Sequence, residues 1–180
     1  MLVSLAVFNI GATATTAPAT TRANVISEFQ GDYRFLSNFF PAVIDFEGIT
    51  YPSVEHAYQS AKTLDPAERK RIAACATPAD AKREGRALAA AGKQRADWEQ
   101  AKFDVMERCV RYKFTRHEDL KQKLLATGDA TLEEGNTWDD RIWGISPPNS
   151  GHGDNRLGKL LMKVREQLRA APAPPPAPAR

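Results

Sequence analysis

The sequence predicts an α+β fold: a mainly helical single domain with a few short strands. Its 180 residues suit one domain, and 42% hydrophobic with 26% charged residues is the composition of an ordinary globular protein. Apolar residues recur at helical spacing through the middle and the end of the chain, whereas strand-like segments are short.

Both ends are expected to lie outside this domain, which we place at residues 25–169. Residues 1–24 start with an apolar run but hold no Lys or Arg before Arg22, so the basic region of a signal peptide is missing. We expect this segment to be disordered or a misassigned start. Residues 170–180 are an Ala/Pro-rich tail that we expect to be disordered, because its prolines cannot continue a helix. No stretch approaches the 18 apolar residues of a membrane span, so we expect a cytoplasmic protein without a membrane partner.

The first half of the domain changes from strands to helices. Residues 25–50 mix aromatic and turn-forming residues, and 43–49 have the character of a strand followed by a turn. Ser53 can cap a helix that runs to about Leu64. Two more helices begin where an N-cap residue is followed by proline, at Asp65–Pro66 and at Thr77–Pro78–Ala79–Asp80.

The second half is helical apart from one stretch. A buried helical stripe is formed by Trp98, Ala101, Val105 and Cys109. The capping box Thr115–Glu118 predicts a further short helix. Between Thr131 and Ile145, strand character returns around Leu132 and around Ile142–Trp143. The last helix has an apolar face made of Leu157, Leu161, Val164 and Leu168.

One helical stripe carries the most informative polar residues. Glu55, Gln59 and Lys62 are spaced by four and three, so they share one helix face beside an apolar face. A carboxylate and an amine this close can change each other's pKa. On spacing alone, a surface ion pair is the simpler explanation of the pattern.

Three other segments can contribute to a site. Trp138 and Trp143 flank carboxylates in a turn-like stretch; a buried aromatic hairpin with solvated aspartates is the alternative. Free N–H groups where the last helix opens suit a phosphate, although Asp154 or Asn155 as an N-cap is equally good physics. The fourth segment is Arg34 to Phe40, whose Phe residues favour the core.

Several familiar sites are excluded. The sequence has no G-x-G-x-x-G, no Walker-type G-K-[ST] and no G-x-S-x-G elbow. Its three histidines show no metal spacing with each other or with the two cysteines, so no metal is expected.

The four segments, in this order, resemble the YbiA-like family, also called NADAR. The matching text is Tyr33–Phe39 with Pro41, Tyr51–Gln59 with Lys62, Trp98, Met106, Lys113–Phe114, Trp143–Gly144 and Asn155–Met162. The resemblance covers about residues 26–169 and raises the functional interpretation of the Glu55–Lys62 stripe. It implies a compact, helix-rich α+β domain without a cofactor.

The resemblance also implies an activity. One branch is similar to N-glycosidases that hydrolyse phosphoribosylamino-pyrimidine intermediates of riboflavin biosynthesis. Another resembles hydrolases that remove ADP-ribose from guanine in DNA, and a non-catalytic ADP-ribose or nucleotide-binding module is a third possibility. The expected partner is thus a small phosphoribosyl or ADP-ribosyl substrate, or ADP-ribosylated DNA; the oligomeric state is not predicted.

For such a reaction we expect Glu55 and Lys62 to be catalytic. Glu55 would stabilise the positive charge that grows on the ribose or orient the attacking water. Lys62 would bind phosphate, donate a proton or form a Schiff base. Substrate binding is expected from Arg34, Ser37, Asn38, Phe39, Tyr58, Gln59, Trp138, Asp139, Trp143, Asn155 and Arg156.

Overall fold

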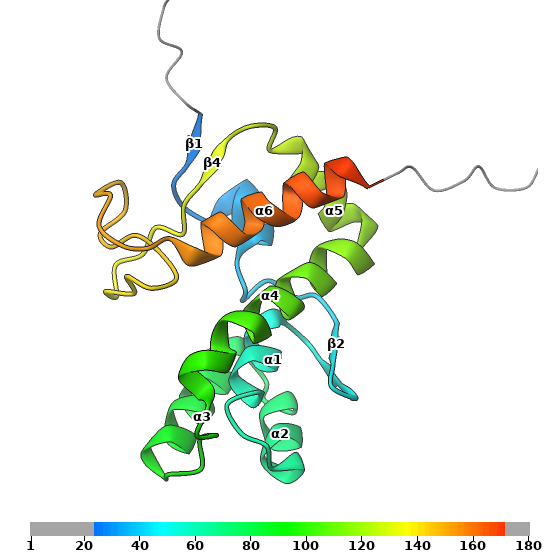
Figure 1. Ribbon diagram of the computed structural model, residues 1–180, viewed down its shortest axis with the longest axis vertical. Coiled ribbons are helices and arrows are strands. Elements are labelled where there is room, and N and C mark those ends of the chain that lie inside the picture. The colour runs from blue at the N-terminus through cyan, green and yellow to red at the C-terminus, as the bar shows by residue number, and fades with distance from the viewer. Residues whose placement is uncertain (1–23, 172–180) are drawn as a thin grey trace, which may run out of the picture.

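A computed structural model describes residues 24–171, and the remaining parts of the two predicted end segments, residues 1–23 and 172–180, lie outside the described residues. The chain enters through strand β1 (Val25–Ile26), which pairs in parallel with β4 (Thr131–Leu132) from much later in the sequence. This pairing brings the start of the domain beside the segment that leads to the tryptophan-rich loop (Figure 1).

The aromatic stretch after β1 is a 3-10 helix, η1 (Gly31–Leu36), rather than the strands and loops expected there. The expected strand over 43–49 is instead the antiparallel hairpin β2 (Ile44–Phe46) and β3 (Ile49–Tyr51). Glu47 and Gly48 turn this hairpin with positive φ angles of 49° and 79°. The turn thus falls inside the segment that sequence alone predicts as one strand.

Three helices follow, and each begins at the cap that its sequence predicts. Ser53, Asp65 and Thr77 cap helices α1 (Val54–Ser60), α2 (Pro66–Ala73) and α3 (Pro78–Ala90), each accepting a hydrogen bond from a first-turn amide. Helix α1 ends at Ser60, four residues before the predicted end, and Lys62 therefore lies in the turn that follows.

Helix α4 (Trp98–Arg116) includes the first two residues of the predicted capping box, Thr115 and Arg116. The Thr115 hydroxyl donates to the Arg111 carbonyl inside α4, so it does not cap the next helix, α5 (Glu118–Ala126). Here the continuous apolar stripe of α4 outweighs the local capping signal. Residues expected to form a strand around Ile142–Trp143 are a turn instead, while Gly135 and Ile145 form an isolated bridge.

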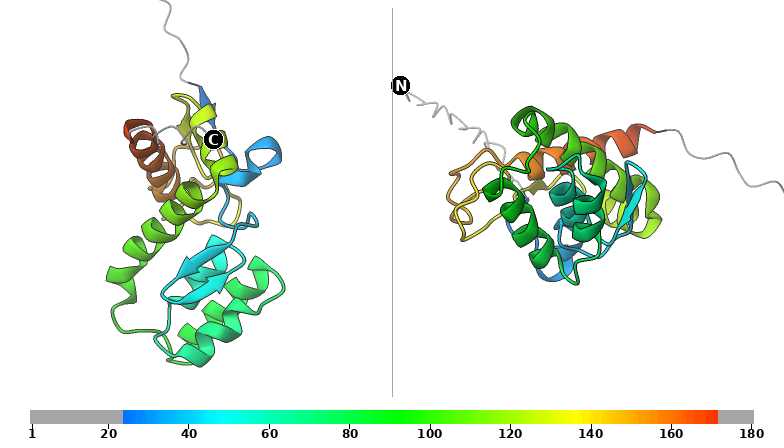
Figure 2. Two further views of the ribbon diagram at one scale, coloured as in Figure 1. Left: turned by 90° about the vertical axis from the view of Figure 1, so that its right-hand side faces the viewer. Right: turned by 90° about the horizontal axis from the view of Figure 1, so that it is seen from below.

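Helix α6 (Arg156–Ala170) extends one residue past the predicted domain end and packs on α4, α5 and β4. Two views show α4 running from the end of the molecule that holds α2 and α3 to the end that holds α5 and α6 (Figures 1 and 2). The mainly helical α+β fold with a few short strands is therefore confirmed. Within the described residues, no helix is long and apolar enough to cross a membrane.

Helix α1 is buried on every side, because it contacts α2, α3, α4 and the hairpin. Its seven residues include Glu55, His56 and Gln59, all of which are buried. The Ser53 hydroxyl lies 2.8 Å from His56 Nδ1, and the Cys75 carbonyl lies 3.2 Å from Nε2, so the imidazole is fully paired as a structural group. Burial lowers the pKa of His56, which keeps the ring neutral.

Candidate active site

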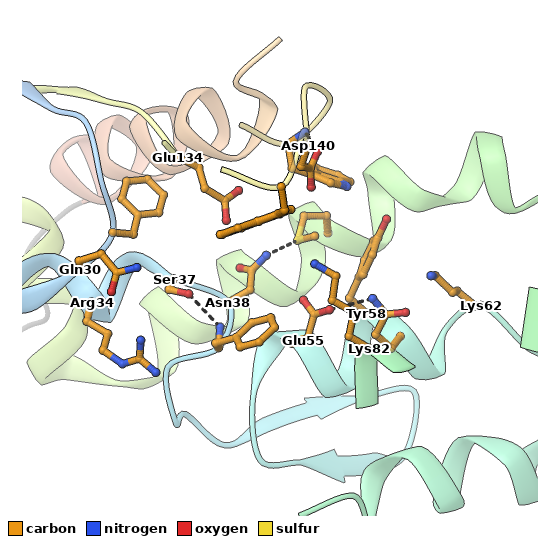
Figure 3. Close-up of a pocket in the computed structure, with 16 residues that line it drawn as sticks. Gln30, Arg34, Ser37, Asn38, Glu55, Tyr58, Lys62, Lys82, Glu134 and Asp140 are labelled. Carbon is orange, nitrogen blue, oxygen red and sulfur yellow. Dashed lines mark hydrogen bonds between the residues drawn. The ribbon is translucent and has the colours of Figure 1, made fainter. Parts of the chain in front are cut away.

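A pocket of about 430 Å³ opens beside α1 and collects side chains from five parts of the chain (Figure 3). Such a volume suits a small organic ligand. The pocket lies against η1 and the loop after it, α1, α3, α4 and the segment after β4. Its lining consists of Phe29, Gln30, Arg34, Ser37, Asn38, Phe39, Glu55, Tyr58, Gln59, Lys62, Lys82, Met106, Glu134, Trp138, Asp140 and Trp143.

Glu55 is the buried carboxyl that α1 brings to the pocket. It is 6% exposed, and Gln59 Nε2 donates a 2.8 Å hydrogen bond to its Oε1. Burial raises the pKa of Glu55, whereas the Gln59 amide and the charges of Lys82 and Lys62 lower it. The i, i+4 spacing seen in the sequence is thus a buried hydrogen bond, and the alternative of a surface ion pair fails for Glu55.

Gln59 is held in place by a glycine on the neighbouring helix. A Cβ on Gly85 of α3 would lie 2.0 Å from Gln59 Oε1, so only glycine lets the two helices approach this closely. The same oxygen is buried without a hydrogen-bond partner. An unpaired buried oxygen costs about 1–3 kcal/mol. The fold tolerates this cost while keeping the Gln59 N–H group on Glu55.

The loop after η1 forms a second wall and is tied to α1. The Glu55 amide donates to the Asn38 carbonyl at 3.1 Å, and the Asn38 side chain donates to Met106 Sδ at 3.3 Å. The fully buried Lys113 of α4 donates from Nζ to the Ser37 carbonyl at 2.8 Å. Burial lowers the pKa of Lys113 to about 7.

Aromatic side chains shape the side of the pocket that leads to Lys62. The Tyr58 ring packs against Trp98 and Trp143, with centroid distances of 5.1 and 5.7 Å. Lys62 Nζ lies 5.9 Å from the Trp98 centroid, and Figure 3 shows the Tyr58 ring between Lys62 and Glu55. Burial lowers the pKa of Lys62, while the Glu55 carboxyl opposes this effect. Both residues predicted to be catalytic line the same pocket, at different depths.

Glu134 and Asp140 bring carboxyl groups to the opposite wall (Figure 3). Burial, with the nearby charges of Asp140 and Glu55, raises the pKa of Glu134 to about 8. Asp140 Oδ1 accepts from the backbone amides of Ile142 and Trp143, at 3.2 and 2.9 Å. Asp140 therefore also fixes the turn that presents Trp143.

Lys82 of α3 lies at the mouth of the pocket. Its ammonium is 5.8 Å from the Phe39 centroid and 5.7 Å from that of Trp138, which is 57% exposed. Arg34 is also exposed, at another edge of the pocket. Cations and aromatic rings thus lie around the opening of the pocket, and carboxyl groups line its interior.

Asp139, expected among the binding residues, does not line this pocket. Its backbone is left-handed, with φ of 61°, and its exposed carboxylate pairs with Arg141 Nε at 2.7 Å. The neighbouring Asp140 enters the pocket instead. Asp139 points away from the pocket because consecutive residues in this turn direct their side chains to different sides.

Asn155 and Arg156 also lie outside this pocket. Asn155 is buried, donates to the Leu132 carbonyl at 2.8 Å and accepts from the Glu134 amide at 3.1 Å. Arg156 stacks at 4.3 Å on Phe103 and pairs with Asp154. It lines a separate hollow of about 270 Å³ that shares Trp143 with the larger pocket. Asn155 thus ties α6 to the segment after β4.

Sequence reasoning missed Lys82, Glu134 and Asp140, although the sequence holds a signal for the first two. Gly85 in the interior of a helix marks a close approach to another element, and Lys82 lies one turn before it on the same face. Glu134 is two residues beyond the buried Leu132, so an extended chain directs both side chains inward. Phe29, Gln30 and Met106 carry no comparable signal.

Comparison with known proteins places this chain in a family. The NADAR domain model matches residues 22–169. The chain is 42% identical over 137 residues to N-glycosidase YbiA of Escherichia coli (strain K12), covering 76% of this chain and 82% of that protein. It is 39% identical over 137 residues to riboflavin biosynthesis protein VVA0006 of Vibrio vulnificus, covering 76% of this chain and 36% of that protein. The NMR structure of the E. coli protein YbiA superposes with a TM-score of 0.70 at 39% identity, over 83% of this chain and 87% of that one.

The fold, the carboxyl-lined pocket and these relatives define an enzyme: a hydrolase acting on N-glycosyl compounds. The chain belongs to the NADAR domain family, as the sequence resemblance predicts. Within residues 24–171, no group of three or more His, Cys, Asp or Glu side chains is arranged to hold a metal ion.

Proposed function

We propose that the protein hydrolyses the C1′–N bond of phosphoribosylamino-pyrimidines, intermediates of riboflavin biosynthesis, and releases ribose 5-phosphate and the pyrimidine. The observation that carries this proposal is the buried Glu55 carboxyl at the floor of an aromatic-walled pocket of about 430 Å³. The name of the V. vulnificus relative, a riboflavin biosynthesis protein, supports the choice of substrate.

The chemistry needs a negative charge beside the anomeric carbon, because positive charge grows on the ribose as the C1′–N bond breaks. Burial raises the pKa of Glu55, but the Gln59 N–H group and two nearby lysines stabilise its carboxylate form, with which Glu55 meets this need. From this position the carboxylate stabilises the ribosyl cation and accepts a proton from the attacking water. Trp143 and Tyr58 provide flat walls against which a pyrimidine ring packs.

The cations at the edges of the pocket suit the phosphate of this substrate. The Arg34 guanidinium is exposed at the rim and can bind phosphate oxygens in a bidentate manner. Lys62, on the far side of Tyr58, supplies a second positive charge. The lowered pKa of Lys62 also makes its amine more nucleophilic, so attack on a ring-opened sugar is its alternative role.

One surface feature favours a second substrate, ADP-ribosylated guanine in DNA. Arg156, Lys159 and Lys163 line the smaller hollow on the other side of Trp143, where DNA phosphates would find positive charge. Two of these cations are already paired, Arg156 with Asp154 and Lys163 with Glu107, which weakens the case. A binding module without catalysis is disfavoured, because the curated relatives are named as N-glycosidases.

The proposal is tested by incubating the full chain with a phosphoribosylamino-pyrimidine and, separately, with an oligonucleotide that carries ADP-ribosylated guanine. Mass spectrometry measures the released base and sugar. Release of the pyrimidine with ribose 5-phosphate is the expected result. Turnover of the oligonucleotide alone would replace the first substrate with the second. Borohydride added during turnover yields a sugar adduct on the wild type, absent from Lys62→Ala, if Lys62 forms an imine.

A further inference from the structure

We propose that Glu134 is the general acid of this reaction and gives the leaving nitrogen its proton as the C1′–N bond breaks. This inference rests on the proposed function and adds a second catalytic carboxyl whose task is opposite to that of Glu55. It assigns a role to a residue that the sequence does not single out.

The position of Glu134 suits this role. Its side chain lines the pocket from the segment after β4, whereas Glu55 comes from α1, and Figure 3 shows the two carboxyl groups on opposite sides of the pocket. A sugar whose C1′ lies between them would present the attacking water to one carboxyl and the departing nitrogen to the other. A general acid has to lie within hydrogen-bond reach of the leaving atom.

The backbone of Glu134 is held firmly by its neighbours. Its amide donates to Asn155 Oδ1 at 3.1 Å, and its carbonyl accepts from the Ile145 amide at 2.9 Å. A Cβ on Gly144 would lie 2.1 Å from the same carbonyl oxygen, so Gly144 permits this close contact. The buried Asn155 and the Trp143–Gly144 pair thus both hold Glu134 at the pocket wall.

The charged groups around Glu134 and Glu55 differ, and they influence which of the two carboxyl groups is protonated. Among the described residues, Glu134 has no hydrogen-bond donor to its carboxyl; Asp140 and Glu55 repel its ionised form, and only Lys82 favours it. Burial raises the pKa of Glu55 as well, and Asp140 adds to this effect, but the Gln59 amide, Lys82 and Lys62 favour its ionised form. With its pKa raised to about 8, Glu134 is mostly protonated at neutral pH and can donate a proton, whereas three neighbouring groups stabilise the carboxylate form of Glu55.

The reaction then balances without any further reagent. Water attacks C1′ while Glu55 takes its proton, and the C1′–N electron pair moves to the nitrogen. The nitrogen takes the proton of Glu134, so the products are ribose 5-phosphate and the free amine. Glu55 loses its proton to solvent and Glu134 regains one, which restores the starting state.

The test compares Glu134→Gln with Glu133→Gln, a matched change at the adjacent residue, which does not line the pocket. Each variant is assayed on the phosphoribosylamino-pyrimidine and on 4-nitrophenyl riboside 5-phosphate, whose nitrophenolate leaves without protonation. We expect Glu134→Gln to lower kcat about 100-fold or more on the amine and less than about tenfold on the nitrophenyl compound. The loss of kcat that the wild type shows above about pH 8 should disappear in Glu134→Gln.

An infrared difference spectrum of wild type minus Glu134→Gln at pH 7 gives a readout without turnover. We expect the stretching band of a neutral carboxylic acid in this spectrum. A missing band, or equal losses of kcat on both compounds, overturns the assignment of Glu134. Failure of the wild-type enzyme to release pyrimidine overturns the proposed substrate instead; kcat of Glu134→Gln on the ADP-ribosylated oligonucleotide is then compared with that on the nitrophenyl compound, and the infrared band reports the protonation of Glu134 in either case.

Discussion

Lys113 supports the candidate active site through a contact with the backbone. Its ammonium lies 5.5 and 5.1 Å from the ring centroids of Phe40 and Phe114, with the Ser37 carbonyl as its hydrogen-bond acceptor. Burial opposes the charged form, which accounts for the lowered pKa. The Lys113–Phe114 pair that the sequence shares with the family therefore supports the loop that carries Asn38.

This burial makes the stability of the protein depend on pH. Because the pKa of Lys113 is lowered to about 7 on folding, the unfolded chain binds more protons above that pH. The free energy of unfolding should then rise with pH from about 7 to about 10.5, by up to about 1.4 kcal/mol per pH unit. Denaturant titrations of the wild type and Lys113→Met over this range measure the effect. The variant should lack this rise, and parallel curves would contradict the prediction.

The sequence predicts which residue types belong to the site better than it predicts where their side chains point. It selects Glu55, Gln59 and Lys62 by their spacing, and all three line the pocket. It cannot choose between Asp139 and Asp140, because the left-handed backbone at Asp139 depends on contacts with distant residues. The sequence predicts that Asn155 binds substrate, because its hydrogen-bond partners cannot be seen in the sequence. These partners, the Leu132 carbonyl and the Glu134 amide, come close to Asn155 only in the folded chain.

At the scale of elements, local caps and apolar stripes account for most of the helices. Ser53, Asp65 and Thr77 start helices where their sequences predict, since side chain and amide are only two or three residues apart. The end of α1 and the junction of α4 with α5 are less predictable. They depend on packing between helices, which the order of residues along the chain does not record.

The contact of α6 with the segment after β4 provides a test at this scale. Asn155→Ala removes one buried and one partly buried hydrogen bond, which the Leu132 carbonyl and the Glu134 amide lose. Loss of about 2 kcal/mol or more in the free energy of unfolding is expected, with lower kcat. The exposed neighbour provides the control Asp154→Ala, expected to change stability by less than about 1 kcal/mol. A variant of Asn155 with unchanged stability and a raised KM alone would instead indicate a direct ligand role.

On the scale of the whole molecule, the pocket depends on contacts between distant parts of the sequence. Pairing of β1 with β4 brings the 3-10 helix beside the segment of Glu134, and α4 spans the two ends of the protein. The sequence predicts the α+β class and the family resemblance, both of which are confirmed. It cannot predict that Glu134 and Lys82 join Glu55, because tertiary contacts alone bring them together.

We propose above all that the buried carboxyl group of Glu55 drives cleavage of an N-glycosidic bond. The most direct measurement is kcat for pyrimidine release by Glu55→Gln, with Glu133→Gln as the control and circular dichroism to check the fold. Our account predicts a loss of about 100-fold or more in kcat. The fold should be intact, because glutamine keeps the size of the Glu55 side chain and its amide oxygen can still accept the hydrogen bond from Gln59. Turnover equal to that of the wild type in a correctly folded Glu55→Gln protein would contradict it.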